Sequence, residues 1–285
     1  MISSMQDRNR NLWGYLFITP QLIGLLAFWV IPLLFTFTLS TMKWDGFGAK
    51  EFIGLENFIT TLTDPDFQKA MINTVYYTIL TIPPQIILGL LVAVALNKVK
   101  GKTFYRTFFF MPVVTSSVSI GVIWMWILNG DFGILNQALS FIGITGPKWL
   151  TDTNWVIPSI SLLSVWWGFG FYMVIFLAGL QGISSTYYEA AEIDGANRFQ
   201  KFWHITLPLL SSTTFLITTM AIIGSFQVFD QAFVMTNGGP AKASYTLVYH
   251  IYDKGFIEFK MGQSASAATI MFLIILGLTL IQFKA

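Results

Sequence analysis

Six stretches of the chain are long and apolar enough to cross a lipid bilayer, which takes about 20 apolar residues. Lipid offers the backbone no hydrogen-bonding partners, so each stretch is expected to be helical. Charged residues make up only 11% of the chain, against about 25% in soluble domains. Prolines inside the stretches, such as Pro112, are expected to kink the helices. The sequence predicts an all-α membrane protein, one domain over 1–285, with six transmembrane helices at about 12–40, 72–97, 104–128, 156–180, 209–233 and 264–283.

The charges between these stretches predict the topology. The connector from Asn97 to Arg106 carries four basic residues and no acid, and short basic connectors stay in the cytoplasm. Arg8 and Arg10 precede the first stretch and no small-residue cleavage site follows it, so we interpret it as a retained span, not a signal peptide. Both termini and 181–207 are then expected in the cytoplasm, and 41–71, 130–155 and 234–263 outside.

The internal connector 181–207 is longer than a turn between two helices requires. Ser184 or Ser185 can cap a helix over Tyr187 to Ile193. Gly195 can end or bend that helix, and a second helical stretch, 197–205, would lead to Pro208 and the fifth span. The pattern predicts a protruding elbow of two short helices. An ordinary cytoplasmic loop remains the alternative.

Catalytic and metal-binding patterns are missing from the sequence. It contains no cysteine, no HExxH, no evident Ser/His/Asp set and no GxxxxGK[ST] phosphate-binding loop. His204 and His250 are isolated. We therefore expect no enzyme activity, no metal and no cofactor in this chain. An ion-coupled secondary transporter is the main alternative, but it would need ionisable groups within the membrane. Asp230, near the outer end of the fifth span, is almost the only such group in the spans. A position at a solvated helix end explains Asp230 equally well.

The connector 181–207 carries a recognisable motif. Residues 189–196 read EAAEIDGA, followed by Phe202, Ile205, Leu207 and Pro208. This resembles the EAA loop of the membrane subunits of ATP-binding-cassette importers that are fed by a solute-binding protein. Further stretches resemble the carbohydrate-type permeases of that group, which include the maltose and glycerol-phosphate permeases: Gly54–Phe58, Asp64–Pro65, Asn73–Thr74, Phe229–Asp230, Thr236–Pro240, Tyr249, Tyr252, Phe256 and Gly262.

The resemblance implies a type I importer permease fold with cytoplasmic coupling helices, and a function in carrying a sugar or oligosaccharide inward. The elbow would dock into a cleft of a separate ATPase, which would hold ATP and magnesium. The coupling residues would be Glu189, Ala190, Ala191, Asp194, Gly195, Ala196 and Pro208, with Tyr187, Tyr188, Phe199, Phe202 and Trp203 anchoring the elbow to its own bundle. For Glu189, a merely favourable interaction with the helix dipole is the alternative.

The same resemblance places a substrate pathway on one face of the fourth span and one of the fifth: Ser164, Trp167, Gly168, Phe171, Ala221, Gly224, Ser225 and Val228. Each set follows i, i+3, i+4, i+7 spacing and so lies on one helix face. Small residues on such a face also let membrane helices pack together, which is the alternative interpretation. Ser116, Ser117 and Ser119 are expected to bond backbone carbonyls rather than substrate.

Partners and location also follow from the resemblance. We expect a second, related but different permease chain, two ATPase copies inside, and a solute-binding protein docked outside on 41–71 and 234–263. The location would be the plasma (inner) membrane of a prokaryote, with the lipid bilayer around the spans, and no nucleic-acid partner is expected. Two features depart from the family pattern. No second proline occurs in 211–214, which predicts a straighter start to the fifth span. The chain also stops at Ala285, whereas relatives often carry a short basic tail there, so we expect a trimmed C-terminus.

Overall fold

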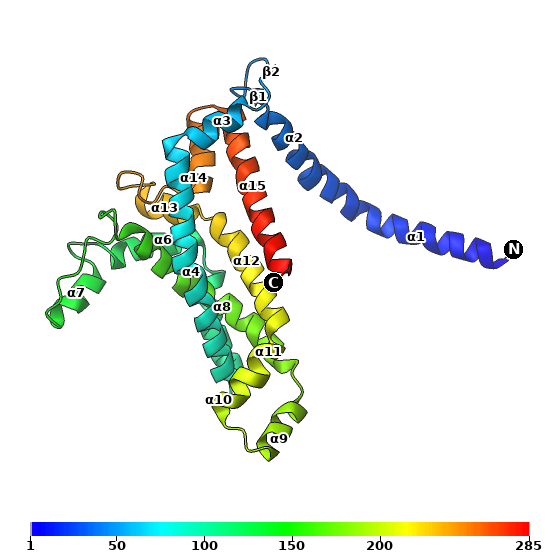
Figure 1. The fold of residues 1–285 in the computed structure, drawn as a ribbon, viewed down its shortest axis with the longest axis vertical. Helices are drawn as coiled ribbons and strands as arrows, with labels where there is room; N and C mark the ends of the chain where they lie inside the picture. Colours follow the sequence, from blue (N-terminus) through cyan, green and yellow to red (C-terminus); the bar gives the residue numbers. More distant parts are fainter. Residues whose placement is uncertain (1, 98, 285) are drawn as a thin grey trace. The chain divides into compact units, whose positions relative to one another are not determined.

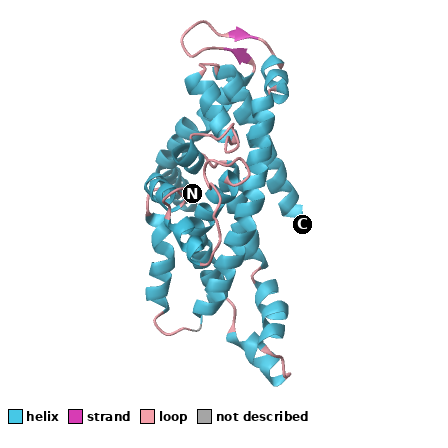
Figure 2. Cartoon of the chain, turned by 90° about the vertical axis from the view of Figure 1, so that its left-hand side faces the viewer, coloured by secondary structure: helices cyan, strands magenta, loops and turns pink. Residues whose placement is uncertain are grey.

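The computed structural model describes residues 2–97 and 99–284, with side chains from residue 13 onward. Helices dominate it, and a single two-stranded sheet is present in the described ranges (Figures 1 and 2). The chain divides into two compact units, Met1–Thr63 with Ile251–Ile270, and Asp64–His250 with Met271–Ala285. Two of the unit boundaries fall inside helices, α14 (Leu247–Tyr252) and α15 (Met261–Lys284). That the chain is one domain stays a prediction.

The first unit begins with a long helical segment made of α1 (Ile2–Leu25), a π-helical turn (Leu26–Val30) and α2 (Ile31–Ser40). The π turn lies just before Pro32, and a second π turn (Phe202–Thr206) lies just before Pro208. A proline ring cannot donate to the carbonyl four residues earlier and collides with it, so a wider turn relieves both helices. The prolines therefore distort these helices without ending them.

A short hairpin of β1 (Met42–Lys43) and β2 (Glu51–Phe52) and the helix α3 (Glu56–Thr63) follow. Asn57 fixes them in place, because its Nδ2 donates to the carbonyls of Ser40 (3.0 Å) and Met42 (2.8 Å). Gly262, at the start of α15, packs so closely that a Cβ there would lie 2.0 Å from the Met42 carbonyl oxygen. Two of the residues that carry the family resemblance thus have a structural role in this unit. A third π turn (Asp253–Ile257) completes it.

The second unit is built on α4 (Pro65–Asn97) and α8 (Val156–Gln181), which pack along each other. Around them lie α5 (Lys102–Val114), α6 (Ser117–Ile127), α7 (Ile134–Phe141), α9 (Ser185–Ile193), α10 (Arg198–Lys201), α11 (Leu207–Leu209), α12 (Ser211–Phe226) and α13 (Asp230–Thr236). The core joins α4, α8 and α12 through Ala93, Leu96, Met173, Phe176, Leu177, Leu180, Leu210 and Ile217. Glycines permit the closest approaches: a Cβ on Gly170 would lie 2.0 Å from the Phe109 carbonyl oxygen of α5.

Four helical segments are long and apolar enough to cross a membrane: Trp13–Ser40, Pro65–Asn97, Val156–Gln181 and Met261–Lys284. Two bent pairs bring the number to six if each pair is one span. The third predicted span is more than kinked: α5 and α6 meet at 93°. The break lies at Thr115 and Ser116, whose backbones are extended, three residues beyond the proline expected to cause a kink. Trp167 Nε1 donates to the freed Thr115 carbonyl at 3.3 Å.

The fifth span also differs from the prediction. Its start is not straight, because Arg198–Leu209 and Ser211–Phe226 meet at 65°. Leu210 occupies the bend with its side chain fully buried in the core, so packing sets the angle and no second proline is required. The span also ends earlier than residue 233: α12 stops at Phe226, residues 227–229 are not helical, and α13 begins at Asp230.

Candidate functional site: a polar cavity and an exposed elbow

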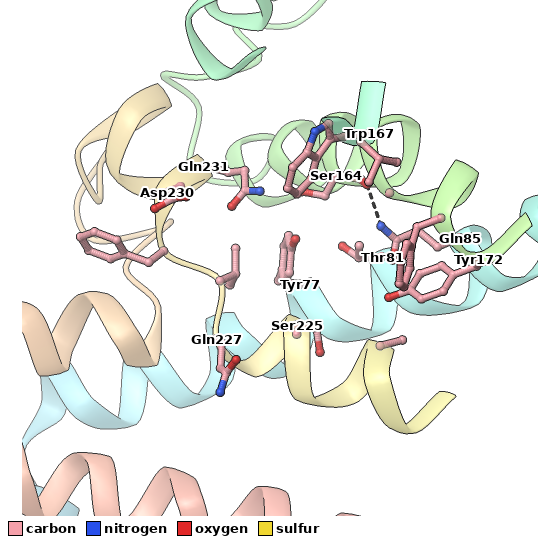
Figure 3. Close-up of a pocket in the computed structure, with 17 residues that line it drawn as sticks. Tyr77, Thr81, Gln85, Ser164, Trp167, Tyr172, Ser225, Gln227, Asp230 and Gln231 are labelled. Carbon is pink, nitrogen blue, oxygen red and sulfur yellow. Dashed lines mark hydrogen bonds between the residues drawn. The ribbon is translucent and has the colours of Figure 1, made fainter. Parts of the chain in front are cut away.

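A cavity of about 400 Å³ opens in the second unit between α4, α5, α8, α12 and α13 (Figure 3). All eight residues predicted to face the substrate line it: Ser164, Trp167, Gly168, Phe171, Ala221, Gly224, Ser225 and Val228. The two predicted helix faces therefore come together around one space. Their role in substrate passage stays a prediction.

The predicted lining of the cavity did not include a wall formed by α4. Tyr77, Thr81 and Gln85 line it at four-residue intervals, and hence on one helix face (Figure 3). Polar residues at this spacing inside an apolar span are a signal that the sequence does contain. Further lining residues are Val113, Tyr172, Gln227, Phe229, Asp230 and Gln231.

Hydrogen bonds fix several of the lining side chains. Gln85 Nε2 donates to the Ser164 carbonyl at 2.7 Å (Figure 3), and Thr78 Oγ1 donates to Ser225 Oγ at 3.0 Å. Gly168 leaves room for the first of these bonds, since a Cβ there would lie 2.4 Å from Gln85 Nε2. Gly224, by contrast, has no atom within 4 Å of its would-be Cβ. Gly168 thus fits the interpretation that small residues allow close packing of helices, whereas Gly224 leaves open space, as the substrate-pathway interpretation expects.

Asp230 is the first residue of α13 and is exposed to the cavity. Ser117 Oγ, at the start of α6, donates to its Oδ2 at 2.6 Å. The expectation that Ser117 bonds a backbone carbonyl is therefore wrong; the break between α5 and α6 lets its side chain reach a residue 113 positions further on. The adjacent tryptophans also separate, because Trp167 lines the cavity while Trp166 contacts Trp124, with ring centroids 5.7 Å apart.

The segment after α13 is held by side chains from α4. Asn73 Nδ2 donates to the carbonyls of Lys242 and Tyr245, both at 2.9 Å. Thr74 Oγ1 accepts a hydrogen bond from the Leu247 backbone N–H at 3.0 Å. The Asn73–Thr74 pair therefore fixes the stretch after Pro240 against α4.

The predicted elbow is confirmed as a structure. Ser184 caps α9 by accepting from the Thr186 backbone N–H at 3.3 Å. Gly195 follows the helix in the left-handed conformation, with φ +77°, which glycine adopts at no steric cost. Asn197 then starts α10 through a capping box: its Oδ1 accepts from Gln200 N (2.9 Å), and Gln200 Oε1 accepts from Asn197 N (2.8 Å).

Most of the predicted coupling residues lie at the surface of the elbow. Glu189, Ala190, Asp194, Gly195 and Pro208 are exposed, and Ala191 and Ala196 are half-buried. The last two help to line a shallow groove of about 410 Å³ together with Asp194, Gly195, Gln200, Lys201, His204 and Ile205. Ile193, which the prediction omitted, is 88% exposed at the end of α9. Glu189 is the fifth residue of α9, beyond the first turn to which the helix-dipole effect is confined.

The predicted aromatic anchors are only partly right. Tyr188 and Phe202 are half-buried, and the Tyr188 hydroxyl bonds Thr206 Oγ1 at 3.0 Å. Tyr187, Phe199 and Trp203 are exposed, with Phe199 71% accessible. They point away from the bundle because successive residues of a helix face different sides, and only one side of each short helix packs. The salt bridge from Lys201 to Glu192, at 2.7 Å, ties the two helices of the elbow together.

Apolar spans, a cavity between them and an exposed two-helix elbow define a helical transport subunit of a membrane. The chain belongs to the family described as binding-protein-dependent transport system inner membrane component, whose family model matches residues 65–284. It is a carbohydrate-type ABC importer permease with the type I fold.

Three relatives illustrate the relationship. The chain is 36% identical to the sn-glycerol-3-phosphate transport system permease protein UgpA of Agrobacterium fabrum, over 95% of this chain and 93% of that protein. It is 34% identical to the arabinooligosaccharides transport system permease protein AraP of Bacillus subtilis, over 95% and 87%. A solved bacterial alginate ABC transporter, in complex with an alginate pentasaccharide-bound periplasmic protein, has a chain of the same fold, with a TM-score of 0.85, 23% identity, and coverage of 97% of this chain and 94% of that chain.

Proposed function

We propose that this permease carries a sugar or oligosaccharide into the cell, driven by ATP hydrolysis on a separate ATPase subunit. The observation that carries the proposal is the elbow. Its two helices are capped, joined by a left-handed glycine and bridged by Lys201 and Glu192, yet much of its surface, Ile193 included, is exposed. Tyr187, Phe199 and Trp203 are exposed on the same short segment as Ile193, and large apolar side chains exposed together, rather than singly, support docking of a partner.

The elbow residues suit such a partner. Ala190, Ala191, Gly195 and Ala196 allow a close approach of backbones, Glu189 and Asp194 offer charged acceptors, and Ile193 would enter an apolar pocket. Pro208 lies behind a π turn where the elbow joins the bundle. Closure of the ATPase would then move the elbow and, through the core residue Leu210, the helices around the cavity as rigid bodies.

The cavity supplies the pathway in this proposal. Its walls combine aromatic rings with hydroxyl and amide groups, and its volume lies in the range of small-molecule sites, about 300–1,000 Å³. Sugars present apolar ring faces for stacking and hydroxyls for hydrogen bonds, so the lining matches both. Substrate would contact Ser164, Trp167, Gly168, Phe171, Ala221, Gly224, Ser225 and Val228, together with the α4 wall.

The complex would need further chains. The proposal includes a second, related permease to complete the pore, two ATPase copies that bind ATP and magnesium in the cytoplasm, and an extracytoplasmic solute-binding protein on 41–71 and 234–263. Both termini and the elbow would lie in the cytoplasm of a prokaryote. The relative solved with its periplasmic protein supports an assembly of this kind.

Reconstitution tests the proposal. The permease pair, the ATPase and the solute-binding protein are placed in proteoliposomes, and uptake of radiolabelled oligosaccharides is followed. We expect uptake that needs internal ATP and the binding protein and survives ionophores. Uptake that instead follows an ion gradient without ATP would favour a secondary transporter. Glu189→Lys should abolish uptake and ATPase binding without affecting membrane insertion, whereas the same reversal at Glu51, exposed on β2, should leave ATPase binding unchanged.

A further inference from the structure

The charge in the lining of the cavity is of one sign. Of the 17 residues that line it, Asp230 is the only one with a side chain charged at neutral pH, and no lysine, arginine or histidine is among them in the described part of the chain (Figure 3). The other polar groups are hydroxyls and amides, from residues such as Tyr77, Thr81, Gln227 and Gln231. A solute in this cavity therefore meets neutral hydrogen-bonding groups, aromatic rings and one carboxylate.

Asp230 is held in a defined position. The Ser117 hydroxyl bonds one carboxylate oxygen, Oδ2, at 2.6 Å, and the backbone of Asp230 begins α13 directly after the non-helical residues 227–229. The two residues come from different helices, so the carboxylate is fixed from outside its own segment. An ionised carboxylate accepts hydrogen bonds through both oxygens, so Oδ1 can serve a ligand while Oδ2 is occupied.

These features discriminate between classes of sugar. Cations make the strongest hydrogen bonds to a phosphate or carboxylate, and the described lining of the cavity contains none. The Asp230 carboxylate is exposed to the cavity, and an anion bound close to it there would be repelled, because like charges at short range are unfavourable. A neutral sugar suffers no repulsion and can donate a hydroxyl to Asp230.

We infer that the permease passes uncharged sugars and rejects phosphorylated or uronic-acid sugars, and that Asp230, fixed by Ser117, is the residue that sets this selectivity. The inference rests on the proposed sugar-import function. It makes the cavity a second filter, independent of the choice made by the solute-binding protein.

The charge of the cavity can be measured without any sugar. The chain has no cysteine, so Gly224→Cys, where a side chain meets open space, places a single thiol in the cavity of the assembled complex. Its reaction rates with cationic and anionic methanethiosulfonate reagents are each divided by the rates with a free thiol. We expect the cationic reagent to be favoured about fivefold or more, and the preference to disappear in Gly224→Cys with Asp230→Asn. The complex without the cysteine gives the background.

The inference would be overturned if the thiol reacted with the cationic and anionic reagents at equal normalised rates. The second permease would then be supplying a positive charge that compensates the negative charge of Asp230. A thiol that reacts with neither reagent, both at position 224 and as Gln227→Cys, would overturn it as well, since the cavity would be closed to solutes.

Selectivity itself is measured by binding to the assembled membrane complex without the solute-binding protein. The probes are arabino- and malto-oligosaccharides and oligogalacturonides of matched length. We expect neutral oligosaccharides to bind and galacturonides to bind at least about tenfold more weakly, with the gap narrowed by Asp230→Asn and, to a lesser degree, by Ser117→Ala. Preferential binding of galacturonides would refute the inference and leave sugar import standing. ATP-independent uptake together with binding of neither class would refute the proposed function, even where the thiol rates show a negative cavity.

Discussion

The turn at Gly195 offers a test of the elbow in which the cost can be worked from the structure. Its φ of +77° is left-handed, and a Cβ added there would meet no atom within 4 Å. The cost of substitution therefore comes from the backbone alone, roughly 1–2 kcal/mol for alanine. Asparagine tolerates this conformation better, and a β-branched residue tolerates it worse. The expected order of function is Gly195, then Asn, Ala and Val.

The strain translates into affinity for the ATPase. A free elbow can relax into another turn, whereas the docked elbow cannot, so up to the full strain energy is lost on docking. For Gly195→Ala this predicts a loss of affinity of up to about 5–30-fold. Binding of the ATPase to permease complexes in nanodiscs, titrated at equilibrium, measures the loss directly, and uptake in proteoliposomes should fall in the same order.

A matched control separates turn geometry from general damage. Gly277 also has open space around its would-be Cβ, but its φ is not positive and it lies inside α15. Gly277→Ala should leave the affinity for the ATPase unchanged. The reasoning fails if Gly195→Val binds the ATPase as well as the parent does, or if asparagine at 195 is worse than alanine.

Three further predictions concern packing and charge. Gly168→Ala would displace Gln85 and break its hydrogen bond to the Ser164 carbonyl, which lowers the stability by about 1–3 kcal/mol. Thermal unfolding of the purified complex measures this loss. Adding Gln85→Ala to Gly168→Ala should cause almost no further loss of stability. Asn73→Ala removes two 2.9 Å hydrogen bonds to 242–245 at about 1 kcal/mol each, so hydrogen exchange should accelerate in 241–247, and unchanged exchange would contradict the role of Asn73. Partial burial raises the pKa of Glu258, but hydrogen bonds from Lys260 and Lys254 outweigh it and leave the pKa below its usual value. The stabilisation is then present above the unfolded pKa of about 4.3 and is lost as the pH falls through the lower folded value. The protection of the amides in 254–260, which is the intrinsic exchange rate at each pH divided by the observed rate, should therefore fall on acidification in the parent and stay level in Glu258→Gln.

Local signals explain why the elbow could be predicted. A serine cap, a glycine that tolerates a positive φ and the Asn197 cap each act within a few residues, so their consequences do not depend on distant parts of the chain. The two faces of the fourth and fifth spans were predicted from the family resemblance, their i, i+3, i+4, i+7 spacing is consistent with one helix face each, and both line one cavity. That spacing could not show which small residue packs and which faces open space, as Gly168 and Gly224 do.

The errors have a common cause. The 93° break between α5 and α6 is accompanied by the bond from Trp167 to Thr115, and the 65° bend at Leu210 by burial in the core. Both depend on helices that lie far away in the sequence. Tyr187, Phe199 and Trp203 were predicted to anchor the elbow to the bundle but are exposed, because the orientation of each short helix decides which side packs.

The sequence by itself determined the apolar spans and the elbow, because hydrophobic length and caps act over a few turns of chain, and it indicated the two helix faces through its resemblance to the family. Only the tertiary structure decided where the third and fifth spans break, that Tyr77, Thr81 and Gln85 complete the cavity, and that Ser117 holds Asp230. These features need residues far apart in the sequence to meet, 113 positions for Ser117 and Asp230, and such meetings depend on how whole helices pack, which no local pattern specifies.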